Sequence, residues 1–377
     1  MDREERPDID NLYMTVCQVI SGNCGWPLTI IMTLDKKPFF AGTYFPKETR
    51  SGRIGMLELI PKIEELWMTH AEDVYASADQ ITETLVKTSR FQQGEELGRE
   101  TLKLAYKQLL ERFDEQNGGF GGAPKFPTAH NLLFLLRYWR STGDKKALQM
   151  VEKSLQSMRR GGIYDHIGFG FHRYSIDSRW LVPHFEKMLY DQALVAISYM
   201  EAYQATRKQE YRDTAQEIFA YVLRDMKSPD GGFYSAEDAE SEGEEGKFYL
   251  WTTSEIHDVL GEEAPLACKV FDIEEAGNFT EEASGKRTGT NILHLPKPLS
   301  DLAYELRVPE VELRARVENM QQKLLAIREK RVRPHEDDKI LTDLNGARYT
   351  KECPRLGSFK RMSRLRKQQD SNLQTEE

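Results

Sequence analysis

Residues 187–233 read KMLYDQALVAISYMEAYQATRKQEYRDTAQEIFAYVLRDMKSPDGGF. The first part, up to Tyr203, is apolar on most of its helical surface, whereas the second part places apolar residues on one side only and ends at a glycine pair. A helix that is apolar all round must be enclosed, and a helix with one apolar stripe belongs on an outer layer. The stretch therefore predicts a buried helix followed by a striped one, with the stripe at Tyr211, Ala215, Ile218, Phe219 and Val222.

The same alternation occurs earlier in the chain. Residues 130–139 are apolar almost all round, and residues 148–158 carry one stripe that ends at Gly161-Gly162. A preceding amphipathic stretch, residues 102–113, leads to another glycine pair at 118–119. Glycine provides a left-handed helix cap and a tight turn, and a repeated helical unit is typical of repeat-like α architectures. We expect two concentric layers of helices; an irregular helical bundle is the alternative.

The N-terminal region has a different pattern. A short helix is predicted at residues 9–19, a β-hairpin at 28–34 and 38–44, and a second helix at 55–67. The fold class expected for the whole chain is therefore α+β multidomain and mostly helical. The predicted boundaries are an α/β segment at residues 1–90, a helical domain at 91–345, and a basic tail at 346–377 that is expected to be disordered.

Composition narrows the possible partners. The chain has 52 Lys and Arg against 61 Asp and Glu, a net charge of −9, which disfavours nucleic acid and anionic membranes as partners. No apolar run approaches the roughly 20 residues of a membrane span. Residues 1–7 lack the apolar core of a secretory signal, so the chain as written is expected in the cytoplasm.

The cysteines and histidines do not indicate a cofactor. The four cysteines are scattered, so neither a disulfide framework nor a zinc site is predicted, and Cys17 and Cys24 are expected to be buried or incidental thiols. No histidine pair has the spacing of a metal-binding helix. We therefore expect no cofactor and no metal.

Three short segments lie between the predicted helices. Residues 246–251 alternate like a strand, and Thr252 to Glu255 resemble an N-capping signal for a helix at 256–260. The run of Glu, Ser and Gly at 240–245 is expected to be a mobile loop.

The densest group of ionisable residues precedes or begins the most apolar helix. Burying unpaired charge is unfavourable, so these residues favour a pocket. His172 and His184 are candidate general acids or bases near neutral pH, and Glu186 and Asp191 are candidate proton-transfer or hydroxyl-binding groups. The structural alternative is that they cap helices or form ion pairs. The candidates for binding a small sugar ligand are His166, Arg173, Trp180, Tyr190, Tyr234, Glu237 and Asp238.

Several sequence motifs resemble the spermatogenesis-associated protein 20 family. They cover residues 2–8 (DREERPD), 25–28 (GWPL), 38–46 (PFFAGTYFP), 119–127 (GFGGAPKFP), 162–166 (GIYDH), 180–192 (WLVPHFEKMLYDQ) and 233–239 (FYSAEDA). The resemblance implies a partial thioredoxin-like domain followed by an incomplete (α/α)6 toroid of the six-hairpin glycosidase kind, as in N-acylglucosamine 2-epimerases. The family pattern continues before Asp2 and after Asp343, so the resemblance implies a chain truncated at both ends, such as a splice form or a gene-model fragment.

The same resemblance implies a function. Vertebrate members are associated with sperm development and are described as secreted. The first expectation is a fragment or isoform that acts in spermatogenesis, differentiation and fertility without catalysis. The second is a carbohydrate enzyme, an epimerase or a glycosidase. The third is a thiol-disulfide oxidoreductase, which the missing Cys-x-x-Cys motif opposes, because six residues separate Cys17 from Cys24.

Overall fold

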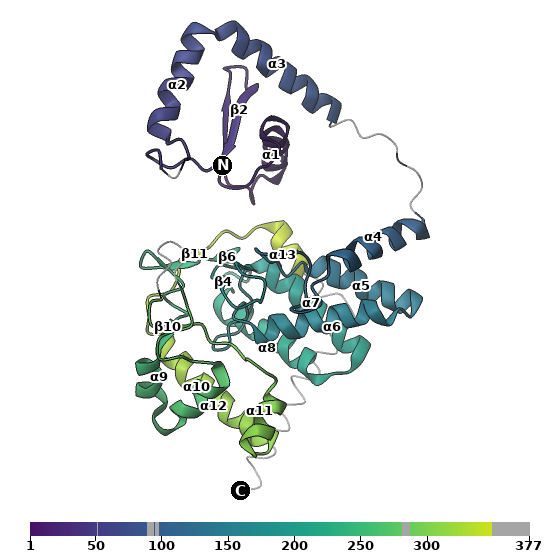
Figure 1. The fold of residues 1–377 in the computed structure, drawn as a ribbon, viewed down its shortest axis with the longest axis vertical. Helices are drawn as coiled ribbons and strands as arrows, with labels where there is room; N and C mark the ends of the chain where they lie inside the picture. Colours follow the sequence, from purple (N-terminus) through teal and green to yellow (C-terminus); the bar gives the residue numbers. More distant parts are fainter. Residues whose placement is uncertain (51, 89–93, 95–97, 281–286, 349–377) are drawn as a thin grey trace. The chain divides into compact units, whose positions relative to one another are not determined.

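A computed structural model describes residues 1–50, 52–88, 94, 98–280 and 287–348. The chain forms two compact units, residues 1–96 and residues 97–377 (Figure 1). Helix α13 (Thr342–Arg348) includes the first three residues of the tail predicted at 346–377. The rest of that prediction lies outside the described residues.

The smaller unit places three helices beside a two-stranded antiparallel sheet. Helices α1 and α3 both contact strand β2, and α2 packs against α3. The hairpin pairs Leu28 with Thr43 and Ile31 with Phe40, which confirms the predicted hairpin despite its turn without glycine. The sequence reasoning did not predict α3. The elements are α1 (Pro7–Ser21), β1 (Leu28–Met32), β2 (Pro38–Thr43), α2 (Met56–Thr69) and α3 (Ala71–Thr88).

The end of α1 corrects the prediction about the cysteines. Cys17 and Cys24 form a disulfide, with their Cα atoms 5.9 Å apart. Helix α1 ends at Ser21, and Gly22 adopts a left-handed conformation with φ of 74°, so the chain turns back toward the helix. Glycine takes this conformation without a steric penalty. The expectation of two separate thiols was wrong because the sequence pattern does not show this reversal.

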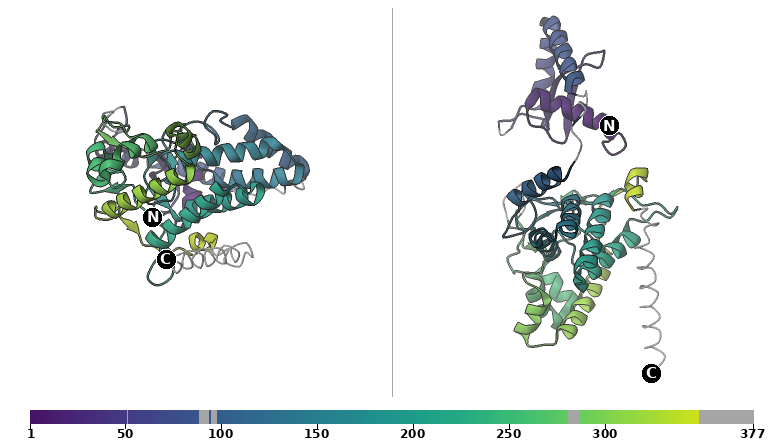
Figure 2. Two further views of the ribbon diagram at one scale, coloured as in Figure 1. Left: turned by 90° about the horizontal axis from the view of Figure 1, so that it is seen from below. Right: turned by 90° about the vertical axis from the view of Figure 1, so that its right-hand side faces the viewer.

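The larger unit is mostly helical. Its helices are α4 (Arg99–Arg112), α5 (Ala129–Thr142), α6 (Lys145–Arg160), α7 (Leu189–Thr206), α8 (Gln209–Asp225), α9 (Thr253–Leu260), η1 (Gly261–Glu263), α10 (Ala264–Phe271), α11 (Leu299–Leu306), α12 (Glu310–Arg328) and α13. Two-residue connections join α5 to α6 and α7 to α8, so each pair is an antiparallel hairpin (Figures 1 and 2).

The helix hairpins have the predicted inner and outer members. Helices α5 and α7 contact each other, and α7 also contacts α6, α8 and α13, so it is enclosed. Outer helix α8 buries one stripe, and the residues of that stripe are Tyr211, Thr214, Ala215, Ile218, Tyr221 and Val222. This arrangement confirms the prediction of a mostly helical, toroid-like architecture.

The glycine pairs act differently from the prediction at one turn. Gly118 and Gly119 have φ of 70° and 77°, as expected for tight turns. Gly161, at the end of α6, has φ of −68° and is not a left-handed cap. A Cβ atom there would lie 2.2 Å from the carbonyl oxygen of Trp180. The prediction for Gly161 was therefore wrong, because close approach of the backbone, rather than handedness, requires glycine.

Short strands connect the helices of this unit. They are β3 (Tyr174–Ser175), β4 (Pro183–His184), β5 (Lys187–Met188), β6 (Ala236–Glu237), β7 (Glu240–Ser241), β8 (Glu244–Glu245), β9 (Trp251–Thr252), β10 (Thr290–Asn291) and β11 (Glu336–Asp337). The mobile loop predicted at 240–245 is instead the hairpin of β7 and β8. The strand predicted at 246–251 is mostly a turn, because Gly246 accepts hydrogen bonds from the amides of Tyr249 and Leu250.

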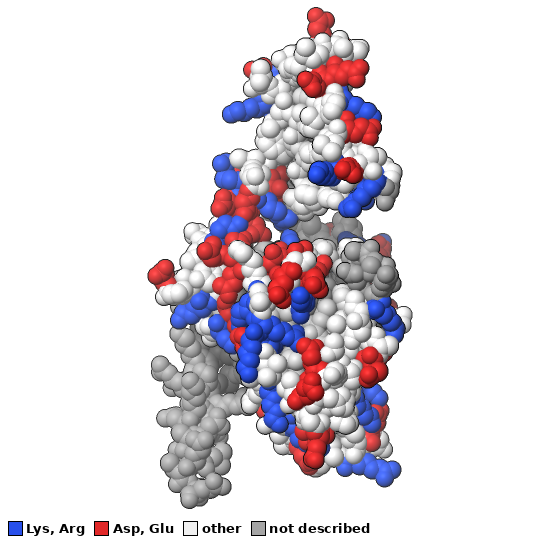
Figure 3. All heavy atoms as spheres, turned by 90° about the vertical axis from the view of Figure 1, so that its left-hand side faces the viewer, with Lys and Arg blue, Asp and Glu red and all other residues white. Residues whose placement is uncertain are grey.

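The second half of the larger unit has its own core. The predicted capping signal is confirmed, since Thr252 and Glu255 form a capping box at the start of α9. Helices α9 to α12 surround a cluster of buried side chains that includes Trp251, Phe271 and Leu313. The surface drawn in Figure 3 mixes acidic with basic side chains. Within the described ranges, no helix combines the length and the apolar composition needed to cross a membrane.

Candidate functional site

A three-stranded sheet brings polar residues from distant segments together. Strand β6 lies between β5 and β11, so Glu237 is the pairing partner of both Lys187 and Glu336. Helix α7 begins directly after β5, and α12 ends shortly before β11. Residues near the start of α7 therefore lie beside residues that follow α8 and α12.

The buried part of this region is an ionic network, here named the core network, of Asp165, Lys187 and Arg328. Lys187 Nζ lies 2.8 Å from Asp165 Oδ2, and the guanidinium of Arg328 donates to both carboxylate oxygens of Asp165, at 2.8 and 2.9 Å. All three side chains are at most 4% exposed. Burial alone would raise the pKa of Asp165, but Arg328 and Lys187 hold it well below its usual range.

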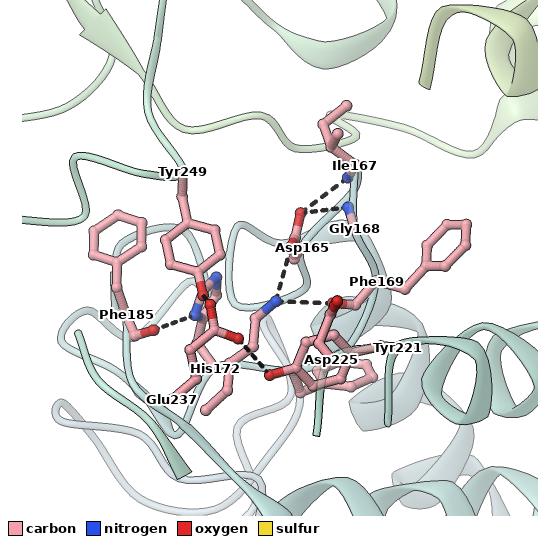
Figure 4. Close-up of polar contacts among 12 residues, drawn as sticks. Asp165, Ile167, Gly168, Phe169, His172, Phe185, Tyr221, Asp225, Glu237 and Tyr249 are labelled. Atoms are coloured by element: carbon pink, nitrogen blue, oxygen red, sulfur yellow. Dashed lines mark hydrogen bonds and ion pairs between the residues drawn. The ribbon is translucent and has the colours of Figure 1, made fainter. Parts of the chain in front are cut away.

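Glu237 completes this buried region with two tyrosines. The hydroxyls of Tyr221 and Tyr249 each donate to its carboxylate at 2.8 Å (Figure 4). Lys187 Nζ lies 4.3 Å and 4.8 Å from the centres of the two tyrosine rings, within the range of cation–π attraction. These residues pair with one another inside the protein, which indicates a structural role, and one buried nitrogen of the network, Arg328 Nε, has no hydrogen-bond partner in the protein.

His172 and His166 are also in the core. His172 is 2% exposed, contacts Phe185 and Tyr249 edge-on, and lies 2.8 Å from the carbonyl oxygen of Phe185 (Figure 4). Burial, together with Lys187, lowers the pKa of His172 to about 3. Burial, together with Arg159, lowers the pKa of His166 to about 3. Both rings are therefore neutral near pH 7.

A second polar group is partly exposed and is here named the His184 cluster: Arg173, His184, Glu186 and Glu245. His184 Nδ1 lies 2.7 Å from Glu245 Oε1, and its Nε2 lies 3.8 Å from Glu186 Oε2. Glu186 also pairs with Arg173 at 2.5 Å. The hydrogen bond from His184 lowers the pKa of Glu245. The His184 side chain is 27% exposed, so this cluster can meet a ligand.

Asp191 lies next to this cluster, in the first turn of α7. Its Oδ2 is buried and makes no hydrogen bond to the protein. Burial raises its pKa to about 7, although Arg173 acts in the opposite direction. A carboxyl group with this pKa changes protonation near neutral pH.

His184 and Glu245 line a cleft of about 1030 Å³. Its other walls include the aromatic residues Tyr174 and Phe279 and the hydroxyl residues Thr288 and Thr290. The ring of Tyr174 stacks on His184, with centres 4.9 Å apart. Aromatic surface beside a few polar groups is typical of small-molecule sites.

The structure brings together only some of the residues proposed from the sequence. His184, Glu186, Asp191 and Arg173 are neighbours, and Tyr190 lies beside Asp191. Trp180 is fully buried, and its Nε1 donates to the carbonyl of Asn117. Glu237 belongs to the core network region, Asp238 is exposed, and Tyr234 is half-buried.

Sequence reasoning missed Glu245 and Arg328. Glu245 was assigned to a loop, and Arg328 lies 163 residues after its partner Asp165, so no local pattern connects them. The Gly-Ile-Tyr-Asp-His stretch that contains Asp165 was the only signal available. Among the residues that the structure describes, no group of three or more His, Cys, Asp or Glu residues is arranged to hold a metal ion.

Known proteins resemble both parts of the chain. A family model described as "Thioredox_DsbH: Protein of unknown function, DUF255" matches residues 1–86. Human spermatogenesis-associated protein 20 is 38% identical over an alignment of 372 positions, which covers 92% of this chain and 47% of the human protein. An uncharacterized protein of Caenorhabditis elegans is 34% identical, and the alignment covers 93% of this chain and 51% of the worm protein. The chain spans about half the length of these relatives.

Solved structures of carbohydrate enzymes show a weaker similarity. Cellobiose 2-epimerase from Bacillus thermoamylovorans matches 38% of this chain and 42% of its own, with 17% identity and a TM-score of 0.34. A family 76 glycoside hydrolase (mannosidase) from Bacteroides thetaiotaomicron matches 85% of this chain and 84% of its own, with 12% identity and a TM-score of 0.31.

Proposed function

We propose that this chain, a homologue within the spermatogenesis-associated protein 20 family, is part of a protein that acts in sperm development. We also propose that its larger unit binds a small polyhydroxylated ligand, such as a sugar, without converting it. The observation that carries the binding proposal is the cleft in which His184 is held between Glu245 and Glu186 beside aromatic surface.

The chemistry of the cleft suits a ligand rich in hydroxyl groups. The carboxylate of Glu245 accepts hydrogen bonds, and the hydroxyls of Thr288 and Thr290 both donate and accept. Tyr174 and Phe279 line the cleft and add apolar surface that suits the C–H side of a sugar ring. Acidic and basic residues both line the cleft, and a neutral ligand avoids the desolvation of a further charge.

The arrangement of the histidines favours binding over turnover. A histidine that acts as a general base needs a ring nitrogen within hydrogen-bond reach of its substrate. In His184, Nδ1 lies 2.7 Å from Glu245 and Nε2 lies 3.8 Å from Glu186, so each ring nitrogen lies near a carboxylate. His172 and His166 are buried and make hydrogen bonds to the backbone. Asp191 has a suitable pKa, but its Oδ2 is buried.

The binding proposal is tested by titrating the chain with N-acetylated hexosamines and simple hexoses while thermal unfolding is followed. We expect a sugar to raise the melting temperature of the unmodified chain. His184→Ala should abolish that increase, and His257→Ala, a change at an exposed histidine of α9 in the same unit, should retain it.

Two outcomes would contradict the proposal. If no sugar stabilises the unmodified chain, the cleft is not a sugar site. If chromatography of the incubated sugars reveals an epimerised or hydrolysed product that His184→Ala does not form, the site is catalytic.

The physiological part of the proposal rests on the name of the mammalian relatives. Disruption of the gene that encodes this chain should lower sperm production, and reintroduction of the gene should restore it. Normal sperm counts in the disrupted line would contradict this role while leaving the binding proposal intact.

A further inference from the structure

The disulfide of the smaller unit joins two sulfurs in different environments. Cys17 lies on the inner side of α1 and is fully buried, whereas Cys24 lies in the connection to β1 and is partly exposed. The two sulfurs therefore differ in access. A thiol in solution can approach the Cys24 sulfur and is kept from the Cys17 sulfur by the surrounding core.

One hydroxyl group contacts both sulfurs. Ser21 Oγ lies 3.5 Å from Cys17 Sγ and 3.4 Å from Cys24 Sγ. The same hydroxyl donates to the carbonyl oxygen of Cys17 at 2.9 Å. Rotation of this hydroxyl directs its hydrogen to a sulfur, where it can stabilise a thiolate that forms there.

The exposed end of the disulfide adjoins an exposed aromatic side chain. Trp26, two residues after Cys24, is 51% exposed, and its Nε1 donates to Asp10 at 2.9 Å. The guanidinium of Arg3 lies 3.9 Å from the centre of its ring. Gly25, between Cys24 and Trp26, is tied to Thr43 of β2 through its amide. The hydrogen bonds to Asp10 and Thr43 hold this segment when the disulfide opens.

We propose that the Cys17–Cys24 disulfide is a thiol-exchange site that accepts two electrons from a dithiol, with Cys24 Sγ as the atom attacked and Cys17 as the leaving group. This activity is separate from ligand binding in the larger unit. It also differs from exchange by a Cys-x-x-Cys pair, because the two cysteines lie on a helix and on the loop that follows it.

The exchange proceeds through two successive thiol–disulfide exchange reactions. A donor thiolate attacks Cys24 Sγ, a donor–Cys24 disulfide forms, and the Cys17–Cys24 bond breaks with its electron pair on Cys17, which takes up a proton. The second donor thiolate then attacks the donor sulfur of the mixed disulfide and releases Cys24 as a thiolate. The donor dithiol is oxidised to a disulfide, and Cys17 and Cys24 are reduced to thiols.

The first experiment uses the unmodified full-length chain. Glutathione, a monothiol, is added under native conditions, free thiols are alkylated, and the position of each group is determined by mass spectrometry. Residues 4–36 form one tryptic peptide that contains both cysteines, because trypsin does not cleave before Pro7, so fragmentation within that peptide locates the adduct. We expect glutathione on Cys24 and the alkyl group on Cys17. Glutathione on Cys17, or equal amounts on both residues, would overturn the assignment.

A second experiment measures reactivity in single-cysteine variants, with Cys268 and Cys353 replaced by serine. The Cys24 thiol of Cys17→Ser should react with 5,5′-dithiobis(2-nitrobenzoate) about tenfold or more faster than the Cys17 thiol of Cys24→Ser. Equal rates in folded variants would contradict the proposal. The unmodified chain should also be reduced by dithiothreitol without urea; reduction only at urea concentrations that unfold the smaller unit would make the disulfide purely structural.

Discussion

The core network and the His184 cluster use the same kinds of side chain in different surroundings. Asp165, Lys187 and Arg328 are almost completely buried and pair with one another, whereas His184, Glu186 and Arg173 are about a quarter exposed. In the interior, an ionised group without its partner is strongly unfavourable, while near the surface water replaces a lost partner. The comparison teaches that exposure, rather than residue type, separates structural charges from charges available to a ligand.

The largest expected effect is at Arg328. Arg328→Met removes both hydrogen bonds to Asp165 and leaves that carboxylate with Lys187 as its remaining ionic partner. We expect the free energy of unfolding of the larger unit to fall by about 3–5 kcal/mol, as measured by urea denaturation. Arg137→Met is the control, because Arg137 is 67% exposed in its pair with Glu201, and it should change stability by less than about 1 kcal/mol. Similar losses of unfolding free energy in both variants would show that burial does not distinguish the ion pairs of the core network from exposed ion pairs.

The next effect is a pH dependence at Asp191. Its pKa in the folded chain is about 7, above the ordinary value of 3.8, so its favourable contribution is complete below pH 3.8 and is lost as the pH rises through 7. Relative to Asp191→Asn, the unmodified chain should lose stability between pH 4 and pH 7, by on the order of 4 kcal/mol at most. Urea denaturation of both proteins across this range measures the difference. Parallel stability profiles would show that Asp191 titrates normally.

A smaller effect is expected from the tyrosine hydroxyls. Tyr249→Phe removes one of the two hydroxyls that donate to Glu237, and the carboxylate stays buried. The loss of a hydrogen bond to a buried charged group should lower the free energy of unfolding by about 1.5–3 kcal/mol. Tyr234→Phe is the control, since Tyr234 is only half-buried. Equal stability of the two variants would show that the hydrogen bond from Tyr249 to Glu237 does not stabilise the fold.

The smallest expected effect on stability is at the His184 cluster. His184→Ala removes contacts with two carboxylates that are 22% and 46% exposed, so water can solvate both of them. The free energy of unfolding should change by less than about 1 kcal/mol. A loss as large as that of Arg328→Met would place the His184 cluster with the structural charges and would weaken the binding proposal.

The sequence predicted the parts of the fold that depend on local spacing. The inner and outer helices, the N-terminal hairpin and the capping box at Thr252 all follow from patterns within a few residues. The grouping of Arg173, His184, Glu186 and Asp191 was predictable for the same reason, because they lie within about twenty residues.

The remaining features depend on contacts between distant residues. The pairing of Arg328 with Asp165 spans 163 residues, and Glu245 reaches His184 through a hairpin that sequence reasoning took for a loop. The need for glycine at Gly161 arises from the backbone of Trp180, which approaches from another segment. The disulfide depends on the reversal at Gly22, a local feature that the predicted helix boundary did not reveal.

The long separation between Asp165 and Arg328 has a consequence for the order of events during synthesis. The hairpins α5–α6 and α7–α8 contain their own buried contacts and are complete once residue 225 has left the ribosome. Asp165 already has Lys187 at that stage, but the guanidinium that binds both of its oxygens belongs to the end of α12. A nascent chain that stalls before residue 328 therefore has the Asp165 carboxylate paired with Lys187 alone. The ion pairing of this domain is completed only when the end of α12 has been synthesised.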